Sequence, residues 1–111
     1  MSNKDSNMEK NTSFKLSITE IIEILMESKS EVRRLYKTDI RGVFGSFVKG
    51  EATETSDIDV LVEFDKGANL LDLTGASIFL EDRLNHTVDL VPESSLRVEF
   101  KEDILKETLY L

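Results

Sequence analysis

Two aspartates separated by one residue are the side chains of this sequence best suited to chemistry. Asp57 and Asp59 flank Ile58, so both carboxylates leave the same face if this segment is an extended strand. Two like charges so close together repel each other unless a cation lies between them. Mg²⁺ prefers oxygen ligands and is usually shared between a few carboxylates and substrate phosphates. The pair therefore predicts a magnesium site for chemistry at phosphorus.

A glycine–serine pair lies upstream, with ten residues between it and Asp57. Gly45 permits a tight turn in which backbone N–H groups approach a phosphate closely. Ser46 offers a hydroxyl and an N–H to the same anion. Lys49 in the same loop could contact phosphate or be a solvated charge, and the sequence favours neither. We expect Gly45 and Ser46 to bind a phosphate group, with Lys49 as a candidate third contact.

A third carboxylate lies in a later apolar run. Asp89 is at the centre of residues 87–91, and a lone charge buried in an apolar strand is costly unless it has a partner such as a metal ion. Together with Asp57 and Asp59 it would form a metal site and the catalytic centre. Two Mg²⁺ ions about 4 Å apart stabilise both the attacking and the leaving oxygen of a displacement at phosphorus.

The alternative is that these residues are ordinary surface. A lone Asp-x-Asp is a weak signal in a chain with 22 acidic residues. At roughly 7% for each residue type, the four fixed Gly-Ser and Asp-x-Asp positions would match by chance about once in several hundred chains of this length. The functional interpretation is therefore preferred. The other polar residues near these positions are interpreted as surface, loop or capping residues: Glu51, Glu54, Glu63, Asp65, Asp72 and His86. Four phenylalanines are interpreted as core residues: Phe44, Phe64, Phe79 and Phe100.

Hydrophobic periodicity predicts the elements that position these residues. A capping box at Ser17–Glu20 begins the first helix. The predicted order is helix 17–37, strand 40–44, a loop over 45–56 with one helical turn, strand 56–64, helix 70–84 despite Gly75, strand 87–91 and helix 101–109. Residues 1–16 are polar and predict a flexible tail, which leaves 17–111 as one domain. We expect an α/β (α+β) fold with a small mixed sheet and helices mainly on one face.

Composition limits the kind of protein. Fourteen basic and 22 acidic residues give a net charge of 14 − 22 = −8, which argues against a long nucleic acid as partner. The 111 residues allow one domain and leave no room for a separate substrate-binding domain. Without cysteine, a signal-peptide pattern or a membrane-length apolar run, we expect a soluble cytoplasmic protein with no membrane partner.

The motif Gly-Ser-x10-Asp-x-Asp resembles the signature of the DNA polymerase β-like nucleotidyltransferase superfamily. The longer run GSFVKGEATETSDIDVLVEF is similar to its minimal nucleotidyltransferase domains, in particular the MntA-type antitoxins. The resemblance covers residues 17–111 and implies that Gly45 and Ser46 bind the triphosphate. It also implies that Asp57 and Asp59 ligate both metals, while Asp89 ligates one and assists deprotonation of the acceptor hydroxyl.

The activity implied by this resemblance is transfer of AMP from ATP to a partner protein, with Mg²⁺ as cofactor. The implied acceptor is a tyrosine of a HEPN-domain toxin encoded by a neighbouring gene. Two alternatives stay open: a non-catalytic antitoxin that masks its partner stoichiometrically, and nucleotidyl transfer to a small molecule. Enzymes of the second kind usually carry an added helical domain, which a partner or an oligomer would have to supply.

Overall fold

The computed structural model describes residues 16–111, so the predicted tail, apart from Leu16, lies outside the described residues. The elements are α2 (Ile18–Tyr36), β1 (Thr38–Phe44), α3 (Ser46–Lys49), β2 (Ile58–Phe64), α4 (Leu70–Leu84), β3 (Val88–Pro92), the 3-10 turn η1 (Glu93–Ser95), α5 (Val98–Glu107) and β4 (Leu109–Tyr110). Up to α4, the bounds agree with the predicted elements to within about two residues. No helix in this part of the chain is long and apolar enough to cross a membrane.

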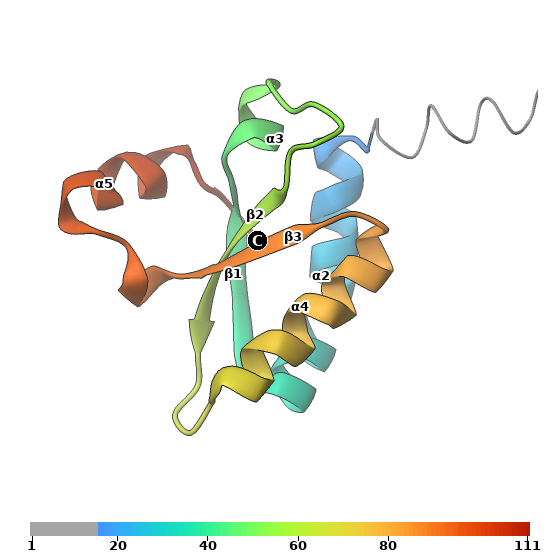
Figure 1. Ribbon diagram of the computed structural model, residues 1–111, viewed down its shortest axis with the longest axis vertical. Coiled ribbons are helices and arrows are strands. Elements are labelled where there is room, and N and C mark those ends of the chain that lie inside the picture. The colour runs from blue at the N-terminus through green and yellow to red at the C-terminus, as the bar shows by residue number, and fades with distance from the viewer. Residues whose placement is uncertain (1–15) are drawn as a thin grey trace, which may run out of the picture.

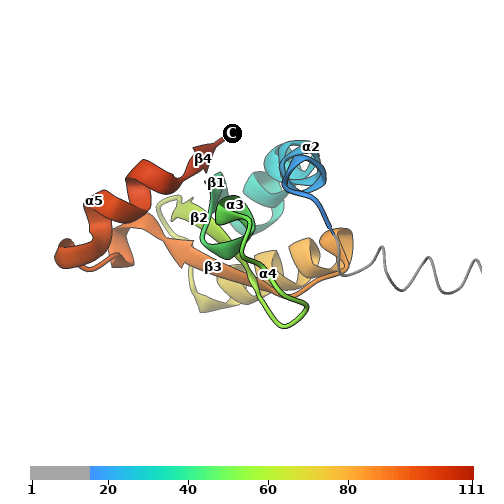
Figure 2. The ribbon, with the colours of Figure 1, turned by 90° about the horizontal axis from the view of Figure 1, so that it is seen from above.

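The four strands form one mixed sheet in the order β3-β2-β1-β4. Figure 1 labels β1, β2 and β3 among the helices, and Figure 2 labels all four strands. β1 is antiparallel to both β2 and β4, whereas β2 is parallel to β3. The parallel pair is connected by α4, because parallel strands need a long crossover. α2 and α4 cover one face of the sheet, while α5 lies on the other side (Figure 2). The predicted mixed sheet with helices mainly on one face is therefore confirmed.

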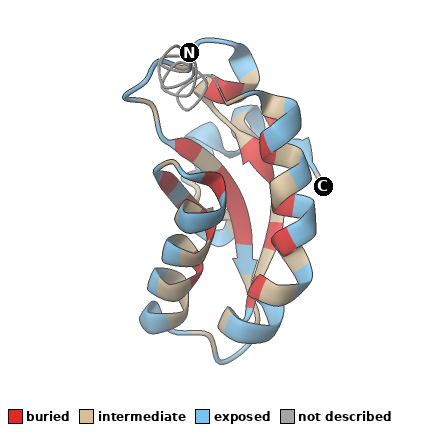
Figure 3. Ribbon diagram, turned by 90° about the vertical axis from the view of Figure 1, so that its right-hand side faces the viewer, coloured by how far each residue is buried: buried red, intermediate tan, exposed pale blue. Residues whose placement is uncertain are grey.

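The main core lies between this covered face and the two long helices. Figure 3 looks onto these helices, and their buried positions face the sheet. α2 contributes Ile21, Leu25 and Val32, all with 0% exposure, at the helical spacing that the sequence predicts. The capping box that begins α2 is present, because Glu20 N donates to Ser17 Oγ and Ser17 N donates to Glu20 Oε1.

α4 begins at a second capping box, in which Asn69 and Asp72 exchange hydrogen bonds, so the predicted capping role of Asp72 is confirmed. Gly75 lies inside this helix, where glycine normally weakens helical stability. A Cβ at this position would collide with the ring of Tyr36 in α2. The glycine is therefore explained by the close approach of α2 and α4 rather than by a helix end.

The central strand β2 has its two faces in different surroundings. Ile58, Val60 and Val62 point into the main core, as their alternation predicts. Leu61 is on the opposite face with Asp59 and is also fully buried, although it lies outside the main core cluster. The face that carries the acids is thus partly covered rather than fully solvated.

The C-terminal predictions were wrong in three respects. The helix there spans 98–107 rather than 101–109, and Leu109 belongs to β4, where it pairs with Val43. Thr108 has extended backbone angles, so the chain leaves the helix and adds two residues to the free edge of β1. Phe100 is 54% exposed instead of being core, and the Arg97 guanidinium lies 6.0 Å from its ring centroid.

Candidate active site

Strand register brings the predicted site residues to one place. Asp59 on β2 is the direct partner of Asp89 on the parallel strand β3. On its other side Asp59 pairs with Phe44, the last residue of β1, so Gly45 follows immediately beside it. Neighbouring strands lie about 5 Å apart, so residues from three distant segments of the sequence meet around one carboxylate.

Gly45 lies against that carboxylate. Its φ of +87° is in the region that L side chains rarely adopt, and a Cβ here would overlap the Asp59 carboxylate. The backbone N–H groups of Val48 and Lys49 donate to Gly45 O at 3.1 Å, which closes the short helix α3 directly after the turn. Only glycine therefore allows β1, the turn and Asp59 to approach each other this closely.

The electrostatics of Asp59 reflect the crowding of acids. Partial burial raises the pKa of Asp59, and the negative charges of Asp89, Asp57 and Glu107 raise it further, to about 6. The ionised form of Asp59 is therefore disfavoured unless a cation binds beside its carboxylate. A divalent metal ion would relieve the same repulsion.

Asp57 is held in place by its neighbours. Thr87 Oγ1 donates to Asp57 Oδ1 at 2.5 Å, and this contact joins the start of β2 to the residue before β3. The preceding Ser56 bonds through its carbonyl to His86 Nε2 at 2.6 Å. His86 also packs edge-on against the buried Phe47, with centroids 5.4 Å apart, so the expected solvated loop residue is instead a half-buried support for the site.

The argument for Asp89 needs a correction. Its side chain is exposed, as is that of Asp57, so no buried charge in β3 demands a metal partner. Within residues 16–111, no three acidic or histidine side chains already form a group that could hold a metal ion. The donors are nevertheless all carboxylates on one sheet face, and Mg²⁺ commonly takes its remaining ligands from water and substrate phosphates. The residues present fit that ion.

Glu107 was missed by the sequence analysis. Its Oε1 accepts a hydrogen bond from Gly45 N at 3.3 Å and lies 3.7 Å from Lys49 Nζ. Lys49 is therefore paired with Glu107 rather than being a purely solvated charge. Ser46 is half-buried at the first position of α3, next to the same turn. No spacing rule connects Glu107 to Gly45, because 62 residues separate them.

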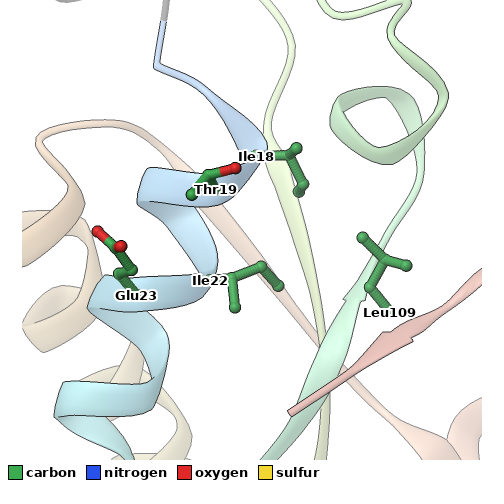
Figure 4. A pocket seen from close by; sticks show the side chains of 5 residues that line it. All are labelled: Ile18, Thr19, Ile22, Glu23 and Leu109. Atoms are coloured by element: carbon green, nitrogen blue, oxygen red, sulfur yellow. The ribbon is translucent and has the colours of Figure 1, made fainter.

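A small pocket lies elsewhere, between the start of α2 and β4 (Figure 4). Its volume is about 230 Å³, and it is lined mostly by apolar side chains: Ile18, Thr19, Ile22, Glu23 and Leu109. None of the three aspartates lines it. This pocket is therefore separate from the carboxylate cluster.

Comparison with known proteins agrees with this geometry. A family model described as "Nucleotidyltransferase domain" matches residues 25–111. The chain belongs to this nucleotidyltransferase family. The predicted resemblance is confirmed, and the chain is by family a nucleotidyltransferase, a class of enzymes that uses a nucleoside triphosphate and a divalent metal ion.

Individual relatives extend over most of the chain. The chain is 41% identical over 96 residues to the protein adenylyltransferase MntA of Thermococcus cleftensis, covering 86% of this chain and 97% of that protein. A solved structure of a candidate minimal nucleotidyltransferase is 36% identical, with a TM-score of 0.65, over 80% of this chain and 94% of that one. A crystallised toxin–antitoxin with AMP-PNP is similar in fold, with a TM-score of 0.58 and 22% identity, over 81% of this chain and 68% of that one.

Proposed function

We propose that this nucleotidyltransferase transfers AMP from ATP to a hydroxyl of a partner protein, and that the partner is a HEPN-domain toxin whose activity is thereby controlled. The observation that carries this proposal is the register of Asp59 with Asp89, directly beside the Gly45 turn. The 41% identity to a protein adenylyltransferase supports protein as the acceptor class. A similar fold in a toxin–antitoxin with AMP-PNP is consistent with the partner class.

In this proposal the aspartates and the glycine turn have separate roles. Asp57 and Asp59 would hold two Mg²⁺ ions, Asp89 would hold one of them, and Gly45 N–H and Ser46 would bind the triphosphate together with Lys49. When bound, Mg²⁺ neutralises phosphate charge and favours an in-line displacement. Thr87 positions Asp57 through its short hydrogen bond.

The reaction balances without a further reactant. The Asp89 carboxylate accepts the proton of the acceptor hydroxyl, whose oxygen forms a bond to the α-phosphorus of ATP. The bond from the α-phosphorus to the bridging oxygen breaks, and pyrophosphate leaves with that electron pair. Because little covalent chemistry falls to the protein, positioning and electrostatic stabilisation provide most of the rate.

The test is to incubate the chain with ATP, Mg²⁺ and the protein encoded by the neighbouring gene, and to record the mass of both proteins. We expect the mass of the partner to increase by one AMP. Asp59→Asn should lower the transfer rate roughly a thousandfold, because one ligand of the charged site is lost. Asp82→Asn, a matched change at an exposed position of α4, should leave the rate unchanged.

The same variants distinguish transfer from masking. If the complex forms but no nucleotide is ever attached, the catalytic proposal is wrong. If Asp59→Asn protects cells from the partner as fully as the unmodified chain, the chain acts by stoichiometric binding. Transfer to a small molecule would appear as labelled product of low mass while the partner stays unmodified.

A further inference from the structure

Glu107 occupies a position that suits an anion from outside the protein. Its Oε1 accepts from Gly45 N at 3.3 Å and lies 3.7 Å from Lys49 Nζ. A backbone N–H beside a lysine ammonium is a donor set that binds phosphate oxygens as readily as carboxylate oxygens. The carboxylate of the chain itself is therefore bound where the proposed function requires part of the triphosphate.

The position of Glu107 is defined by the segment that follows it. Thr108 is buried, and its Oγ1 donates to Ile104 O at 2.7 Å. Leu109 then pairs with Val43 of β1, two residues before Gly45. The Glu107 side chain is 26% exposed, whereas Glu102 on the same helix is 82% exposed. Pairing of β4 with β1 thus directs one particular glutamate of α5 into the site.

The surroundings of this carboxylate are partly unfavourable. Glu107 lies near enough to Asp59 to contribute to the raised pKa of that residue, along with Asp89 and Asp57. Like charges repel, so the N–H group and the lysine must offset a repulsion that the carboxylate itself increases. A ligand that used the same two donors would remove both the competition and part of the repulsion, provided that Glu107 moved away.

We propose that Glu107 mimics a phosphate of the nucleotide: it occupies the triphosphate position in the free protein and is displaced when a nucleoside triphosphate binds. The inference rests on the proposed function, because that proposal assigns Gly45 and Lys49 to the triphosphate. The C-terminal segment α5–β4 then lowers nucleotide affinity and changes conformation on binding. Only ligands that carry phosphates compete with Glu107, so the nucleoside alone is indifferent to it.

The experiment compares nucleotide binding by calorimetry to the full chain and to Glu107→Gln. The amide oxygen can still accept from Gly45 N, but the negative charge is gone. Two unit charges about 4 Å apart in a solvated site interact by about 1 kcal/mol, so we expect Mg²⁺–ATP to bind roughly fivefold more tightly. Adenosine should bind the variant and the unmodified chain equally. Glu102→Gln removes one charge from the exposed side of α5 and should leave both affinities unchanged.

Each outcome has a defined meaning. Unchanged or weaker binding of Mg²⁺–ATP to Glu107→Gln overturns the inference, and weaker binding would identify Glu107 as a ligand of the metal–nucleotide complex. If Glu107→Gln does not fold, Glu107→Asp retains the charge but withdraws it by one methylene, and should bind ATP more tightly by a smaller factor. Unchanged or weaker binding to the aspartate variant overturns the inference as well.

The failure of this inference is distinguishable from that of the proposed function. If the unmodified chain binds no ATP in the presence of Mg²⁺, both proposals are wrong. If it binds ATP and attaches AMP to its partner but Glu107→Gln binds ATP with unchanged affinity, only the inference about Glu107 is wrong.

Discussion

The two faces of the sheet differ in what their side chains do for the fold. On the face covered by α2 and α4, Ile58, Val60 and Val62 are fully buried against apolar side chains of the helices. Burial of such side chains contributes roughly 1.5–3 kcal/mol each to stability. On the opposite face, one residue away along the same strand, Asp59 carries a raised pKa among three other acids. One strand thus contributes to stability with one face and carries the proposed active site on the other.

This difference shows why such a small domain can carry a charged site. The acids repel one another, which destabilises the folded state in the absence of a cation. The apolar side chains of the covered face supply the stability that offsets this repulsion, and those of β2 point away from the acids. Substitutions on one face at a time, with stability and AMP transfer both measured, therefore test whether the two faces act independently.

The largest stability effect is expected on the covered face. Leu25 is fully buried in α2, and Leu25→Ala should lower the free energy of unfolding by about 2–5 kcal/mol, because it removes apolar contacts and leaves a cavity. Chemical denaturation measures this loss. The transfer rate per folded molecule should stay unchanged, since Leu25 is in the core and the site is on the other face.

A matched exposed change on the same helix gives the control. Met26 is 57% exposed, and Met26→Ala should change stability by less than about 0.5 kcal/mol. If Leu25→Ala lowered transfer by the folded protein as strongly as it lowers stability, the two faces would not be independent and the comparison would fail.

The second largest effect is expected at Gly45, in the turn that follows β1. Gly45→Ala should lower stability by about 1–3 kcal/mol through backbone strain, and should also abolish nucleotide binding because the new Cβ would push against Asp59. Gly50→Ala is the matched control, since Gly50 also has a positive φ of 74° but has open space around it. It should cost about 1 kcal/mol and leave nucleotide binding intact. Equal binding losses in the two variants would contradict the role of the close approach.

Much of this arrangement could be predicted from the sequence. The alternation around Asp57–Asp59 predicted β2 and its core face, and the capping box at Ser17 predicted the start of α2. The family signature predicted which aspartates and which turn come together, because it encodes a register that local periodicity cannot. The alternation and the capping box are strong signals, because each depends on residues close together in the chain.

The features that were missed depend on long-range contacts. β4 has two residues, too few for any periodicity, and forms because β1 has a free edge. Glu107 acquires its place only through that pairing, so nothing local distinguishes it from the other acids of α5. Asp89 was predicted to be buried because its run is apolar, but β3 is an edge strand and its outward face is open to solvent.

The smallest expected effect is the pH dependence of stability, which reports the burial of Asp59 and its repulsion by the neighbouring acids. The pKa of Asp59 is about 6 in the folded protein, against an ordinary value of 3.8 for an aspartate. Between these pH values the folded protein holds a proton that the unfolded chain has lost, so stability falls as pH rises from about 4 to about 6 and then levels off. A shift of two units corresponds to nearly 3 kcal/mol, but solvent screening of this half-buried group reduces the expected effect to about 1 kcal/mol.

Asp59→Asn should remove this dependence, because the amide has no charge to desolvate. In the presence of a chelator, the variant should be more stable than the unmodified chain by about 1 kcal/mol at pH 7.5, and the difference should vanish toward pH 4. Denaturant midpoints at several pH values measure this difference in stability. Asp82→Asn, at an exposed position of α4, is the control. A variant that is less stable than the unmodified chain at pH 7.5 would show that the Asp59 carboxylate stabilises the fold, and the contrast between the two faces would then be wrong.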